Sequence, residues 1–375
     1  MRKLNSRGLR ENIEKRINAD IEACRVGGAT VSVMQDDEIV YEGIFGVKNC
    51  ETGEELKPDT IFRIASMTKP VTAAAVLIEM SRKHLSVDDL VSDYLPEYGD
   101  MDVGRIEDGR PVVTGHADVP LRIYHLLSHT SGIATGNIGD LRFMMSPEQK
   151  STMQGVVGFY AGQPLGFEPL SAQMYSTTSF DVAARIIELT SGMPFDRYLE
   201  KELYAPLGMK DTTFAPTPEQ FERLICLHNL EDGRSVNVPG VPGCVFGDYA
   251  LTYTGAGAGL ASTLKDYQAF AQMLLHRGDG IIAHELVDRM ASQNIPSSIM
   301  PGNQKWGLGV RVITEESYRY LPVGTFGWSG AYGTHFWVDP ADSVTAVYMK
   351  NSVYDGGSGA VTAANFEKDV EEAFE

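Results

Sequence analysis

The feature that most constrains this chain is the position of its strand-like segments. Runs rich in β-branched and aromatic residues occur near the start, at Ala29–Met34 and Glu38–Gly46, and return only toward the end of the chain. Gln35-Asp36-Asp37 separates the first two runs, which indicates a hairpin. Segments with helical spacing of apolar residues lie between the two groups. An antiparallel sheet built from both ends of the chain, with helices inserted mid-chain, therefore fits best.

The remaining elements follow from the same patterns. Later strands are expected at Gly307–Ile313, Tyr318–Gly324, Thr334–Val338 and Ser343–Met349. Helices are expected at residues 9–24, Ser66–Lys83, Phe180–Thr190, Phe195–Tyr204, Thr263–His276 and Gly359–Phe374. The predicted fold class is α+β. Residues 1–84 and 225–375 are expected to form a discontinuous sheet domain, and residues 85–224 a mostly helical domain.

Charge and composition exclude several classes of partner. The formal charge of −18 repels a phosphate backbone and an anionic membrane surface, so we expect neither nucleic acid nor membrane as a partner. No apolar run is long enough to span a bilayer, and no secretory h-region follows the N-terminal charges. Cys24, Cys50, Cys226 and Cys244 form no C-x-x-C pair and are expected as reduced thiols. A cytoplasmic location is predicted.

One short motif has the composition of a nucleophile and its base. Ser66-Met67-Thr68-Lys69 places a hydroxyl and an amine three residues apart, so on a helix they share a face. Pro70 suits the first turn of such a helix. The same spacing recurs at Ser262-Thr263-Leu264-Lys265, where a helix start with a solvated lysine is the simpler interpretation. The apolar helix that follows Lys69 favours the first copy.

Further motifs resemble a known family. Their order along the chain is Phe62-Arg-Ile-Ala-Ser66-Met-Thr-Lys69-Pro70, Leu126-Leu-Ser-His-Thr-Ser-Gly132, Pro206-Leu-Gly-Met209 and Gly257-Ala-Gly-Leu-Ala-Ser-Thr263. Together they resemble the serine β-lactamase-related superfamily, which includes class C β-lactamases, D,D-peptidases and family VIII carboxylesterases. The resemblance runs from about residue 28 to residue 350 and implies a β-lactamase/transpeptidase-like fold with an acyl-enzyme on Ser66.

The resemblance also implies roles for residues far from Ser66. Tyr175-Ser176-Thr177 matches the second motif of the esterase-like members, so Tyr175 would take the Ser66 proton with the help of Lys69. Trp328-Ser329-Gly330 replaces the Lys-Thr-Gly of β-lactamases and resembles the Trp-Gly-Gly of the carboxylesterases. The backbone N–H groups of Ser66 and Ala331 would form the oxyanion hole. Trp328, Ser329, Gly330 and Thr177 would contact the substrate.

Two departures from the β-lactamase pattern bear on the substrate. Trp328 cannot pair with a β-lactam carboxylate through charge, and Thr177 stands where class C enzymes have asparagine. Both favour a carboxylesterase that acts on small acyl esters. A β-lactamase or D-amino-acid peptidase, and a binder or sensor that is acylated without turnover, stay open as alternatives.

The sequence calls for no cofactor. The pair His125 and His129 has the i,i+4 spacing of metal ligands, but no glutamate follows the first histidine and no third ligand is evident. We therefore expect no metal. His129 is expected to hydrogen-bond to backbone around Thr130–Gly132. The sequence does not specify an oligomeric state.

Overall fold

Strands from the two ends of the chain pair in one antiparallel sheet. The computed structural model describes residues 1–237, 253–300, 304–315, 320–357 and 359–375. Within them the largest sheet has the order β10-β11-β12-β13-β14-β1-β2-β3. Its centre joins β1 (Gly28–Gln35) to the last strand, β14 (Val344–Lys350), with the predicted hairpin partner β2 (Glu38–Asn49) on the other side of β1. The predicted α+β fold is confirmed.

The other strands are β3 (Glu54–Glu55), β4 (Ile61–Arg63), β5 (Asp102–Glu107), β6 (Arg110–His116), β7 (His228–Glu231), β8 (Arg234–Asn237), β9 (Ala261–Thr263), β10 (Gln304–Trp306), β11 (Arg311–Ile313), β12 (Phe326–Ser329) and β13 (His335–Asp339). The helices are α1 (Ser6–Glu22), α2 (Thr68–Ser81), α3 (Ile123–Leu127), α4 (Pro147–Lys150), α5 (Met153–Ala161), α6 (Thr178–Ser191), α7 (Phe195–Leu199), α8 (Ala205–Leu207), α9 (Pro218–Glu222), α10 (Leu264–Leu275), α11 (His284–Met290) and α12 (Val361–Glu371).

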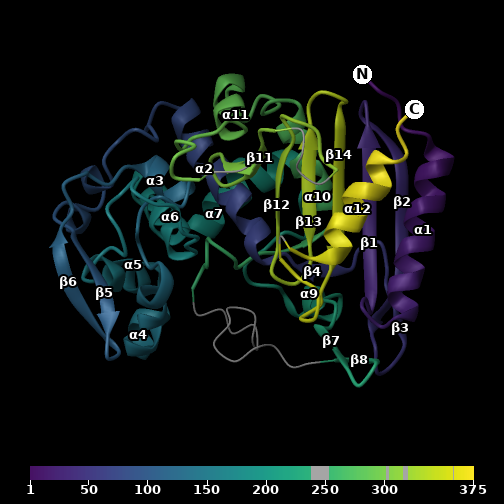
Figure 1. Cartoon of the computed structure of the whole chain (residues 1–375), viewed down its shortest axis with the longest axis horizontal. Coiled ribbons are helices and arrows are strands. Elements are labelled where there is room, and N and C mark those ends of the chain that lie inside the picture. Colours follow the sequence, from purple (N-terminus) through teal and green to yellow (C-terminus); the bar gives the residue numbers. More distant parts are fainter. Residues whose placement is uncertain (238–252, 301–303, 316–319, 358) are drawn as a thin grey trace.

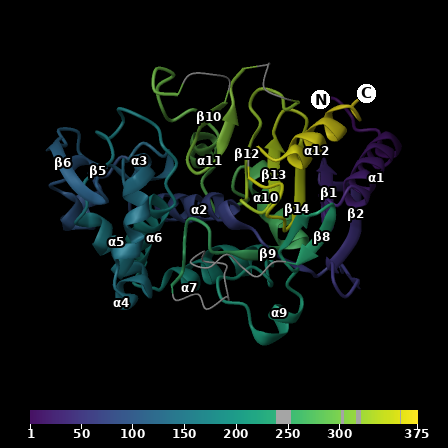
Figure 2. The same cartoon turned by 60° about the horizontal axis from the view of Figure 1, so that its bottom comes forward.

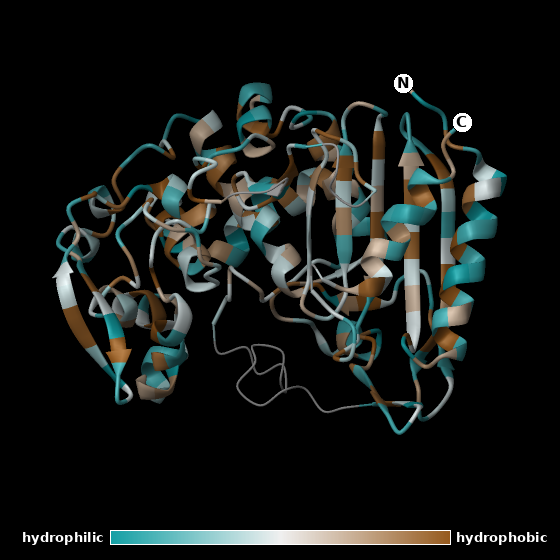
Figure 3. Cartoon of the chain, in the orientation of Figure 1, coloured by the Kyte–Doolittle hydropathy of each residue, from teal (hydrophilic) through white to brown (hydrophobic). Residues whose placement is uncertain are grey.

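The sheet is covered on both faces (Figure 1). The helices α1 and α12 lie on one face, and α10 lies on the other. Side chains alternate along β14 accordingly: Ala346 and Tyr348 join the cluster under α1 and α12, while Val347 and Met349 join the cluster under α10. Figure 3 shows the matching stripes of hydrophilic and hydrophobic residues on α1 and α12. The position of β14 between two helical layers explains why each of its residues is buried.

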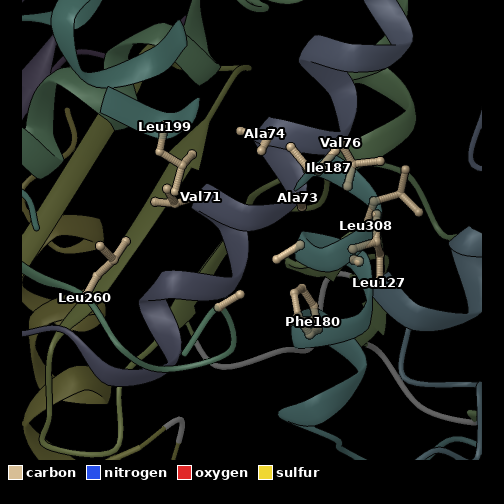
Figure 4. Packing of buried hydrophobic residues seen from close by; sticks show 14 of the residues in the cluster. Val71, Ala73, Ala74, Val76, Leu127, Phe180, Ile187, Leu199, Leu260 and Leu308 are labelled. Atoms are coloured by element: carbon tan, nitrogen blue, oxygen red, sulfur yellow. The ribbon is translucent and has the colours of Figure 1, made fainter. Parts of the chain in front are cut away.

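The helix α2 runs through the interior between the sheet and the mid-chain helices (Figure 2). Every residue from Thr68 to Glu79 is buried, so this helix has no solvent face. It packs against α6, and Figure 4 shows apolar side chains from both helices and from nearby loops filling the space around it. The helix that carries Lys69 is therefore held rigidly on all sides.

Three parts of the predicted secondary structure are wrong. Of the expected strand Gly307–Ile313, only Arg311–Ile313 forms a strand, β11, because the chain turns before it at Gly309, whose φ is +75°. The hairpin β5–β6 lies within the region expected to be helical, and its two-residue turn, Asp108-Gly109, has positive φ at both positions. Of the expected strand Tyr318–Gly324, residues 318 and 319 lie outside the described part, and the rest forms turns. Pro322 lacks an N–H and Gly324 has φ +90°, so this segment turns, with the Gly324 N–H donating to the Ile313 carbonyl oxygen at 2.9 Å, and the strand begins later, as β12.

The structure tests several other expectations only in part. The division at residues 84 and 224 into two domains stays a prediction. Among the described residues, none of the helices combines the length and apolarity needed to cross a bilayer. Cys24, Cys50 and Cys226 are free thiols, and Cys244 lies outside the described residues.

The interior position of α2 gives a test of the fold. Leu77→Ala removes a side chain that is 0% exposed, so it leaves a cavity and lowers the free energy of unfolding by about 2–5 kcal/mol. Leu189→Ala on α6, where the side chain is 44% exposed, is the matched control and changes stability by roughly 0.5 kcal/mol or less. Urea unfolding of both variants measures the difference, and equal effects would contradict the described burial of α2.

Candidate active site

Ser66 lies on a short 3₁₀ turn, Ala65–Met67, between β4 and α2. Ala65 has φ +46°, a left-handed conformation that costs a non-glycine residue energy and is typical of functional turns. The buried hydroxyl of Tyr267 donates a hydrogen bond to the carbonyl oxygen of Met67 at 2.8 Å and thereby helps to fix the position of the turn. The serine is thus presented half-buried on a fixed backbone.

Lys69 directs its amine toward Ser66 from the first turn of α2. The side chain is fully buried, and its Nζ lies 3.5 Å from the Ser66 Oγ. Nζ donates a shorter hydrogen bond, of 2.6 Å, to the carbonyl oxygen of Gly257. It also lies 4.4 Å from the centre of the Tyr175 ring and 5.4 Å from that of Phe180. These contacts compensate a buried cation that would otherwise be costly.

Tyr175 joins this pair from the segment that leads into α6. Its ring stacks on His129 with the ring centres 4.4 Å apart, and the side chain is 38% exposed. The indole Nε1 of Trp328 donates a hydrogen bond to the phenol oxygen at 3.3 Å. Trp306 packs against both Trp328 and His129, so the ring of Tyr175 is bordered by the rings of these three residues. The predicted residues Ser66, Lys69, Tyr175 and Trp328 therefore gather at one site.

His129 is a member of this site that the sequence interpretation missed. It was expected to bond to backbone at Thr130–Gly132, but its Nδ1 instead accepts a hydrogen bond from the Ser176 N–H at 3.1 Å. The neutral ring therefore carries its proton on Nε2. Burial, and then the charge of Lys69, holds the pKa of His129 well below its usual range. The neutral His129 ring therefore stacks on Tyr175 without adding a charge to the site.

Asp181 is a second missed residue. It lies in the first turn of α6, is 1% exposed, and accepts hydrogen bonds from the Ala256 N–H at 2.8 Å and the Tyr253 hydroxyl at 3.4 Å. Burial raises the pKa of Asp181 to about 7, against the opposing effects of Arg142 and Lys69. An acidic residue in the first turn of a helix is common, so the position of Asp181 in the sequence did not single it out. The carboxyl group anchors the segment that supplies the carbonyl oxygen of Gly257.

The third predicted motif lies beside the serine turn, but its side chains differ in role. Trp328 contacts Tyr175, whereas Ser329 is buried and its Oγ lies 2.8 Å from the Nδ1 of His335. A substrate contact through the Ser329 hydroxyl is therefore not supported. Gly330 packs directly on the serine turn, because a Cβ there would lie 2.3 Å from the carbonyl oxygen of Ile64.

The two remaining predicted residues, Ala331 and Thr177, are both exposed. Ala331 is followed by Tyr332, which packs on Ala65 next to the serine. Within the part of the chain that the structure describes, the Ala331 N–H makes no hydrogen bond. Thr177 lies against Gly257, since a Cβ on that glycine would be 2.4 Å from the Thr177 carbonyl oxygen.

The second Ser-x-x-Lys copy has a different environment. Ser262 is fully buried in β9, and its hydroxyl lies 2.8 Å from that of Thr212. Lys265 is exposed on α10, and Thr263 caps this helix by accepting a hydrogen bond from the Asp266 N–H. This serine and lysine are not brought together.

Neither a metal site nor the described cavity coincides with the region around Ser66. No group of three His, Cys, Asp or Glu side chains among the described residues could hold a metal ion. A cavity of about 680 Å³ lies between α7, α8 and α9, and its lining includes Tyr204, Met209 and Thr212 but none of the predicted site residues.

Comparison with known proteins agrees with the fold and the motifs. The family model described as Beta-lactamase matches residues 13–367, so the chain belongs to the beta-lactamase family. The superfamily resemblance read from the motifs is thereby confirmed, as is the serine-hydrolase class that it implies.

Individual relatives refine this picture. The chain is 30% identical to the esterase EstB of Burkholderia gladioli over 91% of its own length and 90% of that protein. It is 27% identical to a putative D-alanyl-D-alanine carboxypeptidase of Salmonella agona (strain SL483), over 85% of its length and 77% of that protein. Among solved structures, EstCE1, a hydrolase with promiscuous acyltransferase activity, superposes with a TM-score of 0.83 at 22% identity, covering 98% of this chain and 99% of that one.

The raised pKa of Asp181 predicts a pH-dependent effect of Asp181→Asn. Between the ordinary value of 3.8 and about 7 the folded protein keeps a proton on Asp181 that the unfolded chain releases. Wild-type stability therefore falls through this group as the pH rises across that interval and is constant above it. The stability of the variant relative to wild type should rise by a few kcal/mol from pH 4 to pH 7 and then level off, since one pH unit corresponds to about 1.4 kcal/mol.

Urea unfolding at several pH values measures this difference. The asparagine also has one acceptor oxygen where the carboxyl group has two, so it cannot accept from both Ala256 and Tyr253, which adds an offset at every pH. The slope with pH is therefore the informative quantity. A difference independent of pH between 4 and 7 would contradict the assignment of a raised pKa to Asp181.

Proposed function

We propose that the protein is a serine hydrolase that forms an acyl-enzyme on Ser66 and acts as a carboxylesterase on small, neutral acyl esters. The observation that carries the proposal is the position of the Lys69 amine. It is buried, lies 3.5 Å from the Ser66 Oγ and faces the ring of Tyr175. Ser66, Lys69 and Tyr175 together supply a nucleophile and the groups that move its proton, which is the arrangement that nucleophilic catalysis requires.

The proposed reaction has two acyl-transfer steps. The Ser66 Oγ attacks the ester carbonyl, and its proton passes to the phenolate oxygen of Tyr175, which lies beside Lys69 and accepts a hydrogen bond from the Trp328 N–H. Tyr175 returns the proton to the leaving alcohol as the C–O bond breaks. Water then attacks the acyl-enzyme and gives its proton to Tyr175. As the bond between Ser66 Oγ and the acyl carbon breaks, Tyr175 returns that proton to Ser66 Oγ and the carboxylic acid leaves.

The negative charge on the carbonyl oxygen needs donors during both steps. The backbone N–H groups of Ser66 and Ala331 are proposed for this role. Ala331 is exposed and follows Gly330, which packs on the carbonyl of Ile64, two residues before Ser66. Fixed N–H donors at an oxyanion are worth about 10²–10³ in rate each.

The surroundings of the site favour an uncharged substrate. Trp328 stands where β-lactamases have a lysine that pairs with a carboxylate, and its N–H is directed to Tyr175. Among the contacts that the structure describes for Tyr175 and Trp328, Lys69 is the one cation, and it is buried. Similarity to the esterase EstB supports the same choice. We therefore propose a small-molecule ester as the partner; a cytoplasmic location stays a prediction from the sequence.

A D-amino-acid carboxypeptidase is the second candidate, favoured by the similarity to the Salmonella protein named as one. Such an activity needs recognition of a terminal carboxylate, for which the tryptophan at position 328 is poorly suited. Peptides ending in D-Ala-D-Ala therefore belong in the same substrate panel.

Steady-state hydrolysis of a short p-nitrophenyl ester and a chromogenic cephalosporin tests the proposal. Ser66→Ala should lower ester turnover at least about a thousandfold, because the nucleophile is lost. Ser262→Ala, the matched serine of the second motif, should retain turnover. Ester activity that survives Ser66→Ala would overturn the mechanism. Strong cephalosporin turnover would indicate a β-lactamase, and a stoichiometric burst without steady state would indicate an acylated binder.

Trp328→Phe tests the hydrogen bond to the phenol. The variant keeps an aromatic ring but loses the indole N–H, so we expect kcat to fall about tenfold while KM changes little. Trp306→Phe is the control, because it changes an aromatic ring next to Trp328 and leaves in place the Trp328 N–H that donates to Tyr175. Equal effects of the two substitutions on kcat would contradict a specific role for the Trp328 N–H.

A further inference from the structure

The turn Gly330–Gly333, which joins β12 to β13, is pressed against the serine turn. Gly330 leaves no room for a side chain beside Ile64, and Tyr332 packs on Ala65. The position of the Ala331 N–H relative to Ser66 is therefore set by how this turn is held. The turn itself contributes a Gly333 N–H to Gly330 carbonyl hydrogen bond of 2.9 Å.

A second segment, Ser352–Gly357, forms hydrogen bonds to this turn and supports it. The Ser352 N–H donates to the Tyr332 carbonyl and the Gly357 N–H donates to the Gly330 carbonyl, both at 2.9 Å. Between these two bonds, a Cβ on Gly356 would lie only 1.8 Å from the Ala331 carbonyl oxygen. The two backbones are thus in direct contact on either side of Ala331.

A buried ion pair fixes this supporting segment. Lys350 is 0% exposed, and its Nζ donates to the Asp355 carboxylate at 2.8 Å. Asp355 also accepts hydrogen bonds from the Val361 N–H at 2.7 Å and the Thr362 hydroxyl at 2.6 Å, at the start of α12. The aliphatic part of Lys350 lies under Gly333, where a Cβ would be 2.1 Å from the Lys350 Cε.

The pair is poorly explained by stability alone. Desolvating two charges offsets most of their attraction, so an apolar pair of similar volume serves a core equally well. A lysine and an aspartate instead impose a defined distance and direction between β14, the supporting segment and α12. That property is useful where a backbone amide has to be held to within a fraction of an ångström.

We propose that Lys350, Asp355 and Gly356 are positioning residues that hold the Ala331 N–H in place for the oxyanion. They act through the turn and do not touch the substrate. This inference rests on the proposed function, because it presupposes an acyl-enzyme on Ser66. It assigns a role in the reaction to side chains on the face of the turn opposite to Ser66.

Gly356→Ala tests the proposal, with Gly359→Ala as the matched control. A Cβ at Gly356 displaces the Ala331 peptide, whereas one at Gly359 meets nothing within 4 Å. We expect Gly356→Ala to lower kcat for ester hydrolysis at least tenfold with KM little changed, and Gly359→Ala to behave as wild type. A boronic acid inhibitor supplies a second readout, because its tetrahedral serine adduct places an oxygen where the oxyanion forms.

The inhibition constant of the boronic acid should rise in Gly356→Ala by about the factor by which kcat falls. Simple loss of folded protein lowers the concentration of active sites, which a burst titration counts, but leaves the inhibition constant unchanged. Lys350→Met provides a second variant in case Gly356→Ala does not fold. It keeps an unbranched side chain that is one atom shorter and lacks the ammonium group, and Asp355 retains its donors from α12. It should weaken boronic acid binding severalfold.

Two results would overturn the proposal, and they are distinguishable. If Ser66-dependent ester turnover is present and both variants keep kcat and boronic acid affinity within twofold of Gly359→Ala, the positioning role is wrong while the proposed function stands. If wild type shows no Ser66-dependent turnover, the proposed function fails and the positioning role fails with it.

Discussion

The site depends on how a buried lysine ammonium is accommodated by the groups around it. Lys69 is completely buried on a helix that is itself buried on every side. An isolated charge in such a place is costly, so everything near its Nζ has to be electron-rich. The Gly257 carbonyl, the Ser66 hydroxyl and the face of the Tyr175 ring meet that need. The same contacts that make the charge tolerable bring the reactive groups together.

This requirement links parts of the chain that are distant in sequence. Gly257 receives the Lys69 hydrogen bond and also touches the backbone of Thr177, close to Tyr175. Asp181 holds the preceding residue, Ala256, by its N–H. A side chain at Gly257 would separate these elements, so the absence of a Cβ is what allows the serine helix and the tyrosine segment to approach each other.

The sequence predicted most of what periodicity and motif order can specify. Strands at both ends gave the sheet, and the apolar run after Lys69 gave a buried helix. The spacing of Ser66 and Lys69 correctly placed their side chains within reach. The errors at β5–β6 and β12 lie where turn residues decide. Asp108-Gly109 forms a hairpin turn, and β12 begins after Pro322 and Gly324 rather than before them.

The contributions of His129 and Asp181 could not be derived from spacing. Each matters through a neighbour from another segment: Tyr175 for the histidine, and Ala256 for the aspartate. The buried position of the Ser329 hydroxyl also depends on another segment, because its partner His335 lies opposite it on the next strand. Motifs identified which segments meet, but not which atoms of those segments face each other.

The pairing of β1 with β14 has a consequence for the order of assembly during synthesis. The first strand of the sheet emerges from the ribosome early, yet the neighbour that completes its ladder is among the last segments made. The β1–β2 hairpin can form alone, but one edge of β1 stays open until β14 arrives. A nascent chain with an unpaired apolar edge is vulnerable to association with other chains. For a chain with this topology, a pause in synthesis at any point between β2 and β14 prolongs the time during which this edge is exposed.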